Sequence, residues 1–255
     1  MGQYMGGSGG SNVEVWGNYN VFDFQLPSDE ELKNMSAIII PGSVDSVNGE
    51  QSWVPLLLRF VKHVYSHHKQ IRILGIAFGC QIVAKALGGL VEPVNPQQAG
   101  NIGAGIFIGK KIVTVNEDFF AQPYVKEVIN PLLSRAKDPA KMSDVIKEEL
   151  EDLIVPSAHS EHVTKLPKGA KCLGSSEKTK NEIWTLDDRV LCMQFHPEFN
   201  CYFIEELIIN KMYDVGQLDD TQMTESLERT KDPALPLTRN IINRIAFNFL
   251  HMNLE

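Results

Sequence analysis

The chain has 255 residues, of which 43% are hydrophobic and 22% charged, and its formal net charge is −8 at pH 7. This composition is typical of a globular protein with a substantial core, and it argues against disorder and fibrous repeats. The acidic balance and the scattered Lys and Arg residues disfavour a nucleic-acid partner, because neutralising phosphates requires clustered positive charge. No apolar run is long enough to cross a bilayer, so we expect no membrane insertion.

The chain shows no readable leader of charged, apolar and small residues. We therefore expect an intracellular protein, cytoplasmic by default, while import into an organelle such as the mitochondrion stays open. The cysteines lack C-x-x-C spacing and mostly fall in apolar patterns, so they predict neither a disulfide framework nor a zinc site. They are Cys80, Cys172, Cys192 and Cys201.

The chain opens with a glycine-rich stretch, residues 1–12, which is expected to be a flexible lead-in. Residues 20–25 (NVFDFQ) alternate apolar and polar side chains, and this alternation predicts a strand. Residues 36–43 and 71–76 contain continuous apolar, β-branched runs, which are typical of strands buried on both faces of a parallel sheet.

Helical patterns alternate with these strands. Residues 50–67 carry apolar side chains at helical spacing, and the helix that starts directly after Ala77 should end at Gly88 and Gly89. The polar stretch 120–152 predicts a helical insertion, or lid, on the surface. The remaining expected elements are strands near 105–108, 111–115, 153–157, 171–175, 181–186 and 189–195, and helices near 200–213 and 236–251.

Strands that alternate with helices predict a three-layer α/β fold, with a mostly parallel central sheet and helices on both faces. No convincing boundary interrupts the pattern, so residues 13–255 are expected to form a single domain.

Three motifs carry a family resemblance: GIAFGCQ at 75–81 followed by KALGG, SAHSEHV at 157–163, and QFHPEF at 194–199. From about residue 20 to the C-terminus the chain resembles a class I glutamine amidotransferase domain, in the branch of γ-glutamyl peptidases and GMP-synthase-like proteins. The resemblance implies a flavodoxin-like fold. It also implies a nucleophilic elbow, where a Cys on a strand-to-helix turn attacks the amide carbon of glutamine.

By this resemblance, His196 matches the catalytic base and Glu198 the acid that orients it, whereas Ala77 occupies the position of the nucleophile and leaves it vacant. The resemblance places Gly42 in the loop that lends an oxyanion N–H group. The oxyanion and substrate-pocket positions are Gly42, Ser43, Gly75, Phe78, Gly79 and Gln81, and the pocket-wall positions are His159 and Glu161.

Two other groups of side chains could carry chemistry. Cys80 lies three residues after Ala77, roughly 4.5 Å along the helix axis, so we expect it to be a packing residue and not a substitute nucleophile. His63 and His67 have a spacing that could hold a metal, and His68 follows, but we expect no acidic third ligand nearby, which leaves the set incomplete. We expect a solvated helix face there, with no metal and no cofactor.

The family's domain normally opens with an apolar strand before the segment that corresponds to NVFDFQ. This chain has only glycine-rich residues and NVEVWG there, so the first strand is expected to be missing. Such a gap would expose unpaired backbone groups. Another chain, or the stretch from Val13 to Trp16, could fill it by adding a strand; a shortened or misassigned start is the alternative.

Three functions stay open. In the first, the protein is a pseudoenzyme that serves as an accessory or structural subunit of a larger assembly, with other protein subunits as partners. In the second, it is an active glutamine amidotransferase or γ-glutamyl hydrolase whose Cys was replaced by Ala. In the third, Gly42, Gln81 and His196 bind glutamine or a γ-glutamyl compound without turnover, as a sensor. We expect no enzymatic activity; an active form would be a glutaminase-type amidohydrolase.

Overall fold

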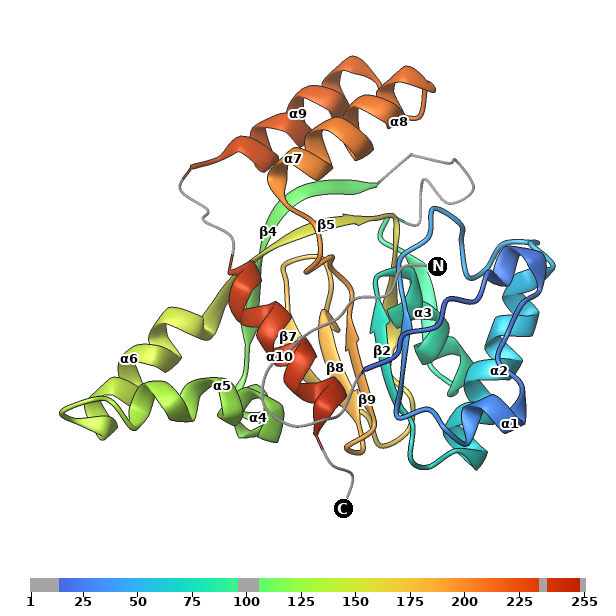
Figure 1. Ribbon diagram of the computed structural model, residues 1–255. Helices are drawn as coiled ribbons and strands as arrows, with labels where there is room; N and C mark the ends of the chain where they lie inside the picture. Colours follow the sequence, from blue (N-terminus) through green and yellow to red (C-terminus); the bar gives the residue numbers. More distant parts are fainter. Residues whose placement is uncertain (1–13, 96–105, 234–237, 253–255) are drawn as a thin grey trace.

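The structure is a computed structural model that describes residues 14–95, 106–233 and 238–252. A 7-stranded sheet runs through the centre of the molecule in the order β1-β2-β9-β8-β7-β4-β5 (Figure 1). Its parallel part consists of β1 (Ala37–Ile40), β2 (Arg72–Ile76) and β9 (Val190–Met193). The antiparallel part continues through β8 (Ile183–Leu186), β7 (Lys171–Ser175), β4 (Phe107–Val115) and β5 (Asp152–His159).

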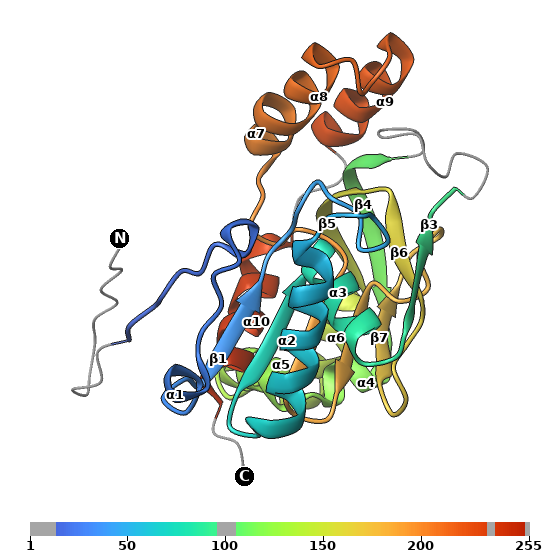
Figure 2. The same cartoon turned by 90° about the vertical axis from the view of Figure 1, so that its right-hand side faces the viewer.

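Helices cover both faces of this sheet (Figure 1 and Figure 2). Side chains alternate along a strand, so Ile73 of β2 joins the apolar cluster on one face and Leu74 joins the cluster on the other. The first face is covered by α2 (Trp53–His67) and α3 (Phe78–Ala86), and the second by α5 (Pro123–Leu133) and α10 (Arg239–His251). The predicted three-layer α/β fold is confirmed. The sheet is mixed: parallel pairing is confined to β1–β2 and β2–β9, and the other neighbouring strands of this sheet pair antiparallel.

β1 forms an edge of the sheet. Within the residues that the structure describes, β1 pairs with β2 alone, and Ile39 is 38% exposed. The prediction that this strand is buried on both faces is therefore wrong, because no further strand among the described residues pairs with its outer edge. Residues 14–16 have no regular structure and Val15 is 83% exposed, so they do not extend the sheet. Val13 and the predicted flexible lead-in, residues 1–12, lie outside the described residues.

The segment NVFDFQ is not a strand. Residues Val21–Asp23 form a 3-10 turn, η1, because the Asn20 side chain accepts a hydrogen bond from the backbone N–H of Phe22 and Phe24 takes a left-handed conformation with φ 57°. Of the apolar side chains that suggested a strand, Phe22 packs edge-on against Trp53 of α2, with ring centroids 4.9 Å apart, and Phe24 is exposed. A short helix, α1 (Asp29–Leu32), follows behind a capping box of Ser28 and Glu31.

The stretch predicted as an insertion is helical, but it is anchored in the core. The stretch consists mainly of three helices, α4 (Glu117–Ala121), α5 and α6 (Pro139–Glu151). In Figure 1, α6 extends away from the sheet at the side of the molecule. Tyr124 of α5 packs edge-on against Phe249 of α10, with ring centroids 5.4 Å apart. A loose surface lid would lack such buried aromatic contacts.

Several elements were not expected from the sequence. β3 (Leu90–Pro93) and β6 (Glu161–Lys165) pair as a small antiparallel sheet, and α9 (Asp220–Lys231) is an additional helix. The helix expected near 200–213 is present, and it is built from α7 (Cys201–Phe203), a π-helical turn η3 (Ile204–Ile209) and α8 (Asn210–Asp214). The strands expected at 105–108 and 111–115 are one strand, β4, bent at Gly109 with φ 130°; residue 105 lies outside the described residues. None of the helices in the described parts has the length and apolar character needed to span a membrane.

Candidate active site

The turn between β2 and α3 is a sharp elbow with Ala77 at its tip. Ala77 has φ 50° and ψ −110°, a conformation that L residues rarely adopt. The flanking glycines permit it: a Cβ on Gly79 would lie 1.8 Å from the carbonyl oxygen of Ile40, and one on Gly75 would lie 2.8 Å from that of Gly79. This strained strand-to-helix turn has the geometry of a nucleophilic elbow.

His196 lies at the same end of the parallel strands as Ala77, the end where β2 and β9 finish. Ile76 pairs with Met193 in parallel register, so the residues that follow β2 and β9 emerge side by side. His196 Nδ1 donates a hydrogen bond to Glu198 Oε1 at 2.8 Å, which leaves Nε2 as an acceptor. The imidazole stacks on Phe199, with ring centroids 4.0 Å apart. An imidazole held in this way is suited to act as a general base.

The loop after β1 faces this imidazole. A Cβ on Gly42 would lie 2.6 Å from His196 Cε1, so only glycine allows the approach. Ser43 holds the loop, because its hydroxyl donates to Asp45 Oδ2 at 3.1 Å. Phe78 points instead into the core beneath the elbow, where it packs on Trp53 at 5.4 Å.

Gln81 and Glu161 form hydrogen bonds that connect neighbouring elements of the site. Gln81 is 4% exposed, and its amide donates to the backbone carbonyl of Glu161 at 2.8 Å. The Glu161 carboxylate accepts hydrogen bonds from Ser46 Oγ at 2.8 Å and Asn48 Nδ2 at 3.1 Å. The bonds to the Glu161 carboxylate tie the loop after β1 to the start of β6, and the bond from Gln81 ties α3 to the same residue. Both side chains therefore hold neighbouring elements of the site together.

A buried polar cluster beside His159 was not foreseen from the sequence. Lys111 Nζ contacts Glu182 Oε1 at 2.5 Å and His159 Nε2 at 2.9 Å. Burial, and then the positive charge of Lys111, lower the pKa of His159 well below its usual value, so the imidazole is neutral. Burial lowers the pKa of Lys111, and the Glu182 charge opposes that shift. One feature of the sequence indicates that Lys111 is buried. It lies two residues before Val113 in the same strand, so both side chains point to the same face of the sheet, and Val113 is buried.

Near this cluster, buried polar atoms lack a hydrogen-bond partner within the described residues. They are Ser157 Oγ, Glu182 Oε2 and Gln194 Nε2. Buried polar atoms are normally paired, so each of these atoms would gain a partner from a bound water molecule or a polar ligand.

The elbow itself carries no nucleophilic atom. Ala77 is 3% exposed and presents a methyl group. Cys80 is fully buried on the other face of the sheet, where its sulfur accepts a hydrogen bond from Trp184 Nε1 at 3.1 Å. The prediction that Cys80 is a packing residue is confirmed.

The three histidines of α2 and its end are not a plain solvated face. His63 and His68 both contact the carboxylate of Asp29, which lies 34 residues before His63 in the sequence. The premise that no acidic partner lies near them is therefore wrong. Hydrogen bonds from His63 and then His68 lower the pKa of Asp29.

Comparison with known proteins agrees with this fold. Gamma-glutamyl peptidase 2 of Arabidopsis thaliana is 29% identical over 223 residues, which cover 88% of this chain and 75% of the peptidase. A GMP synthase of Staphylococcus carnosus is 27% identical over 191 residues, which cover 73% of this chain and 29% of the synthase. Among solved structures, a glutamine amidotransferase from Thermotoga maritima superposes with a TM-score of 0.60 at 18% identity, over 92% of this chain and 86% of its own, a likeness of fold alone.

The family model of the class-I glutamine amidotransferases matches residues 10–214. This range contains the elbow, the loop after β1 and the His196–Glu198 pair, which follow the carboxyl ends of β2, β1 and β9. The chain therefore belongs to the class I glutamine amidotransferase family.

Proposed function

We propose that this chain is a catalytically inactive member of its family, a pseudoenzyme that serves as an accessory or structural subunit of a larger protein assembly. The observation that carries the proposal is Ala77 at the tip of the elbow. A methyl group can neither lose a proton nor attack an amide carbon, so no acyl-enzyme can form at this turn.

The remaining apparatus does not replace the missing atom. His196 and Glu198 form an oriented pair, but in comparable cooperative sets loss of the nucleophile costs on the order of a millionfold in turnover. Cys80 cannot serve, since its sulfur is buried and engaged by Trp184. That the family fold is retained does not contradict the proposal, because a fold can serve a role other than catalysis.

The test is the release of ammonia or glutamate from glutamine and from γ-glutamyl peptides. We expect none from the unaltered chain. Ala77→Cys adds a sulfur to a residue that already holds the elbow conformation, and activity of this variant that disappears in Ala77→Cys/His196→Ala would show that only the thiol is missing. Turnover by the unaltered chain would overturn the proposal.

A second candidate function is the binding of glutamine or a γ-glutamyl compound without turnover. The unpaired buried atoms Ser157 Oγ and Gln194 Nε2 favour it, because a polar ligand would satisfy them. Calorimetry and thermal unfolding with glutamine test this function. No heat and no shift of the melting temperature at millimolar ligand would end it.

The subunit role is supported by the edge of the sheet at β1, with whose outer side no other strand of the described residues pairs. An extended segment of a partner protein can add to such an edge through backbone hydrogen bonds, with side-chain contacts to the exposed Ile39. Ile39→Lys should then release the partner, whereas Ile112→Lys, a matched change at another exposed strand position, should not. Native mass spectrometry of the protein from its own cells measures this, and a lone 28.5 kDa species before any substitution would contradict the subunit role.

A further inference from the structure

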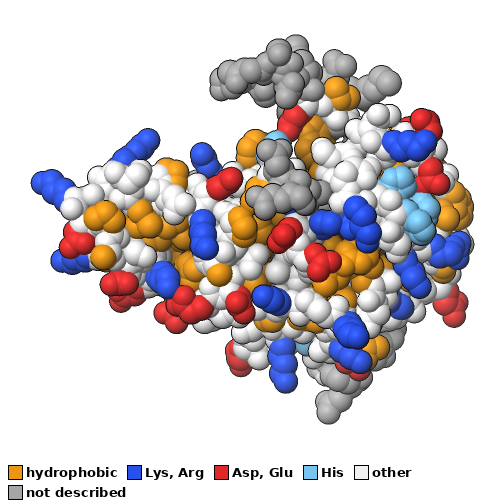
Figure 3. Space-filling model, turned by 90° about the horizontal axis from the view of Figure 1, so that it is seen from below, with side chains coloured by type: hydrophobic (Ala, Val, Ile, Leu, Met, Phe, Trp, Pro, Cys, Tyr) orange, Lys and Arg blue, Asp and Glu red, His pale blue; other side chains and the backbone are white. Residues whose placement is uncertain are grey.

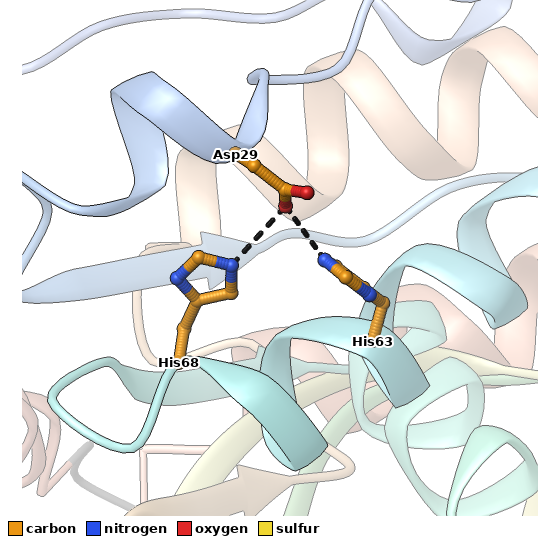
Figure 4. A group of neighbouring side chains, drawn as sticks. All are labelled: Asp29, His63 and His68. Atoms are coloured by element: carbon orange, nitrogen blue, oxygen red, sulfur yellow. Dashed lines mark hydrogen bonds and ion pairs between the residues drawn. The ribbon is translucent and has the colours of Figure 1, made fainter.

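A cluster at the far end of the sheet brings Asp29, His63 and His68 together (Figure 4). The Nε2 atom of His63 lies 2.6 Å from Asp29 Oδ1, and the Nε2 atom of His68 lies 3.2 Å from the same oxygen. One ligand atom from each residue thus falls in a group whose members all lie within 4.8 Å of one another.

The cluster is assembled from separate elements. Asp29 is the first residue of α1, His63 lies in α2, and His68 caps the end of α2. β2 starts at Arg72 and ends at Ile76, directly before Ala77, so the cluster and the elbow lie at opposite ends of that strand, which is about 16 Å long at 3.3 Å per residue. The cluster is therefore separate from the candidate active site.

His67 is not part of the cluster, although it is four residues from His63. Its Nδ1 donates to the carbonyl oxygen of His63 at 3.1 Å, and its ring stacks on that of His63 with centroids 4.6 Å apart. The side chain therefore lies along the helix and does not join the group around Asp29.

The ligand atoms are held in place yet open to solvent. His68 is 8% exposed, and its carbonyl accepts hydrogen bonds from Arg189 Nη2 at 3.1 Å and the Ile71 N–H at 3.0 Å. The Asp29 side chain is 67% exposed and that of His63 is 40% exposed. Figure 3 shows histidine side chains at the surface on the side of the molecule where α1 and α2 lie. An ion can reach the group from solvent without any opening of the fold.

The donor set is that of a transition-metal site. Imidazole nitrogens favour ions such as Zn²⁺, whereas Mg²⁺ and Ca²⁺ require oxygen ligands. Ligands about 2.0–2.2 Å from a tetrahedral Zn²⁺ lie about 3.4 Å from each other. The two Nε2 atoms already converge on one carboxylate oxygen at 2.6 and 3.2 Å, so an ion placed between the three atoms needs only small side-chain movements.

We propose that Asp29, His63 and His68 form a binding site for a divalent transition-metal ion, best matched by Zn²⁺, with a fourth position open to solvent or to a further ligand. The bound ion joins α1 to the end of α2, and so braces the segments that lead into the edge strand β1 and into β2. This site depends on no catalytic role of the elbow.

Titration of the full chain with ZnCl₂ by calorimetry tests the site, with MgCl₂ as the comparison ion. We expect one Zn²⁺ per chain, no heat with Mg²⁺, and a higher melting temperature with Zn²⁺. Asp29→Ala and His63→Ala each remove an exposed ligand and should weaken Zn²⁺ binding at least about tenfold. Co²⁺ should show the visible absorption of a four-coordinate ion in the unaltered chain and lose it in both variants.

His67→Ala is the matched control, because it removes a histidine of the same helix that the structure leaves outside the cluster. Its Zn²⁺ affinity should equal that of the unaltered chain. The proposal is overturned if the unaltered chain binds no Zn²⁺ at millimolar concentration. It is equally overturned if His67→Ala abolishes binding while Asp29→Ala leaves it intact, since the ligands would then be the helical pair His63 and His67.

Discussion

The buried ion pair of Lys111 and Glu182 allows a test of how much stability is lost when one charge in the interior of this protein loses its partner. The side chains of Lys111 and Glu182 are 10% and 0% exposed, and their charged atoms are 2.5 Å apart. Lys111→Met keeps the aliphatic volume but leaves the Glu182 carboxylate buried without its cation. It also removes the donor that His159 Nε2 faces at 2.9 Å.

Breaking one side of a buried ion pair costs about 3–5 kcal/mol, because an uncompensated charge remains in a poorly solvated place. That is a large part of the about 5–15 kcal/mol that stabilises a typical domain. The surface pair Lys147–Glu117 is a matched control, with its charged atoms 2.7 Å apart and side chains 41% and 80% exposed. Lys147→Met should cost no more than about 1 kcal/mol, since water screens that pair.

Urea unfolding followed by circular dichroism measures the free energy of unfolding of both variants. We expect Lys111→Met to lose at least about 2 kcal/mol more than Lys147→Met, and the double variant Lys111→Met/Glu182→Gln to regain most of that difference by removing the orphaned charge. Equal losses in Lys111→Met and Lys147→Met would refute the reasoning.

Three further outcomes are expected. Gly79→Ala should prevent folding into soluble protein, because its Cβ would lie 1.8 Å from the backbone oxygen of Ile40; a soluble variant with native circular dichroism would contradict this. Burial lowers the pKa of His159 well below its value of 6.5 in the unfolded chain, so the unfolded state binds the proton first as the pH falls. The free energy of unfolding should therefore decrease at pH values below about 6.5, by up to about 1.4 kcal/mol per pH unit. In urea unfolding, His159→Phe should reduce this dependence on pH. Alkylation of the native protein, read by peptide mass, should modify Cys172 and Cys201 and spare the fully buried cysteines.

Short-range patterns were sufficient for the centre of the fold. The apolar run at 71–76 predicts β2, and the structure buries all of Arg72–Ile76; the glycines around Ala77 predict the sharp turn into α3. His196 and Glu198 are two residues apart, so their pairing needs no long-range information. In these cases the residues that interact are neighbours in the chain, and the backbone between them leaves few alternatives.

Contacts between distant residues were decided by the tertiary structure. The sequence showed His63 and His68 but not the carboxylate of Asp29 beside them, and it showed Lys111 but not Glu182, which is 71 residues away. The exposure of Ile39 likewise follows from the place of β1 at the sheet edge, because a β-branched run has the same local pattern at an edge as in the interior. Local propensity and spacing determine which elements form, whereas the partners across the fold depend on how those elements pack.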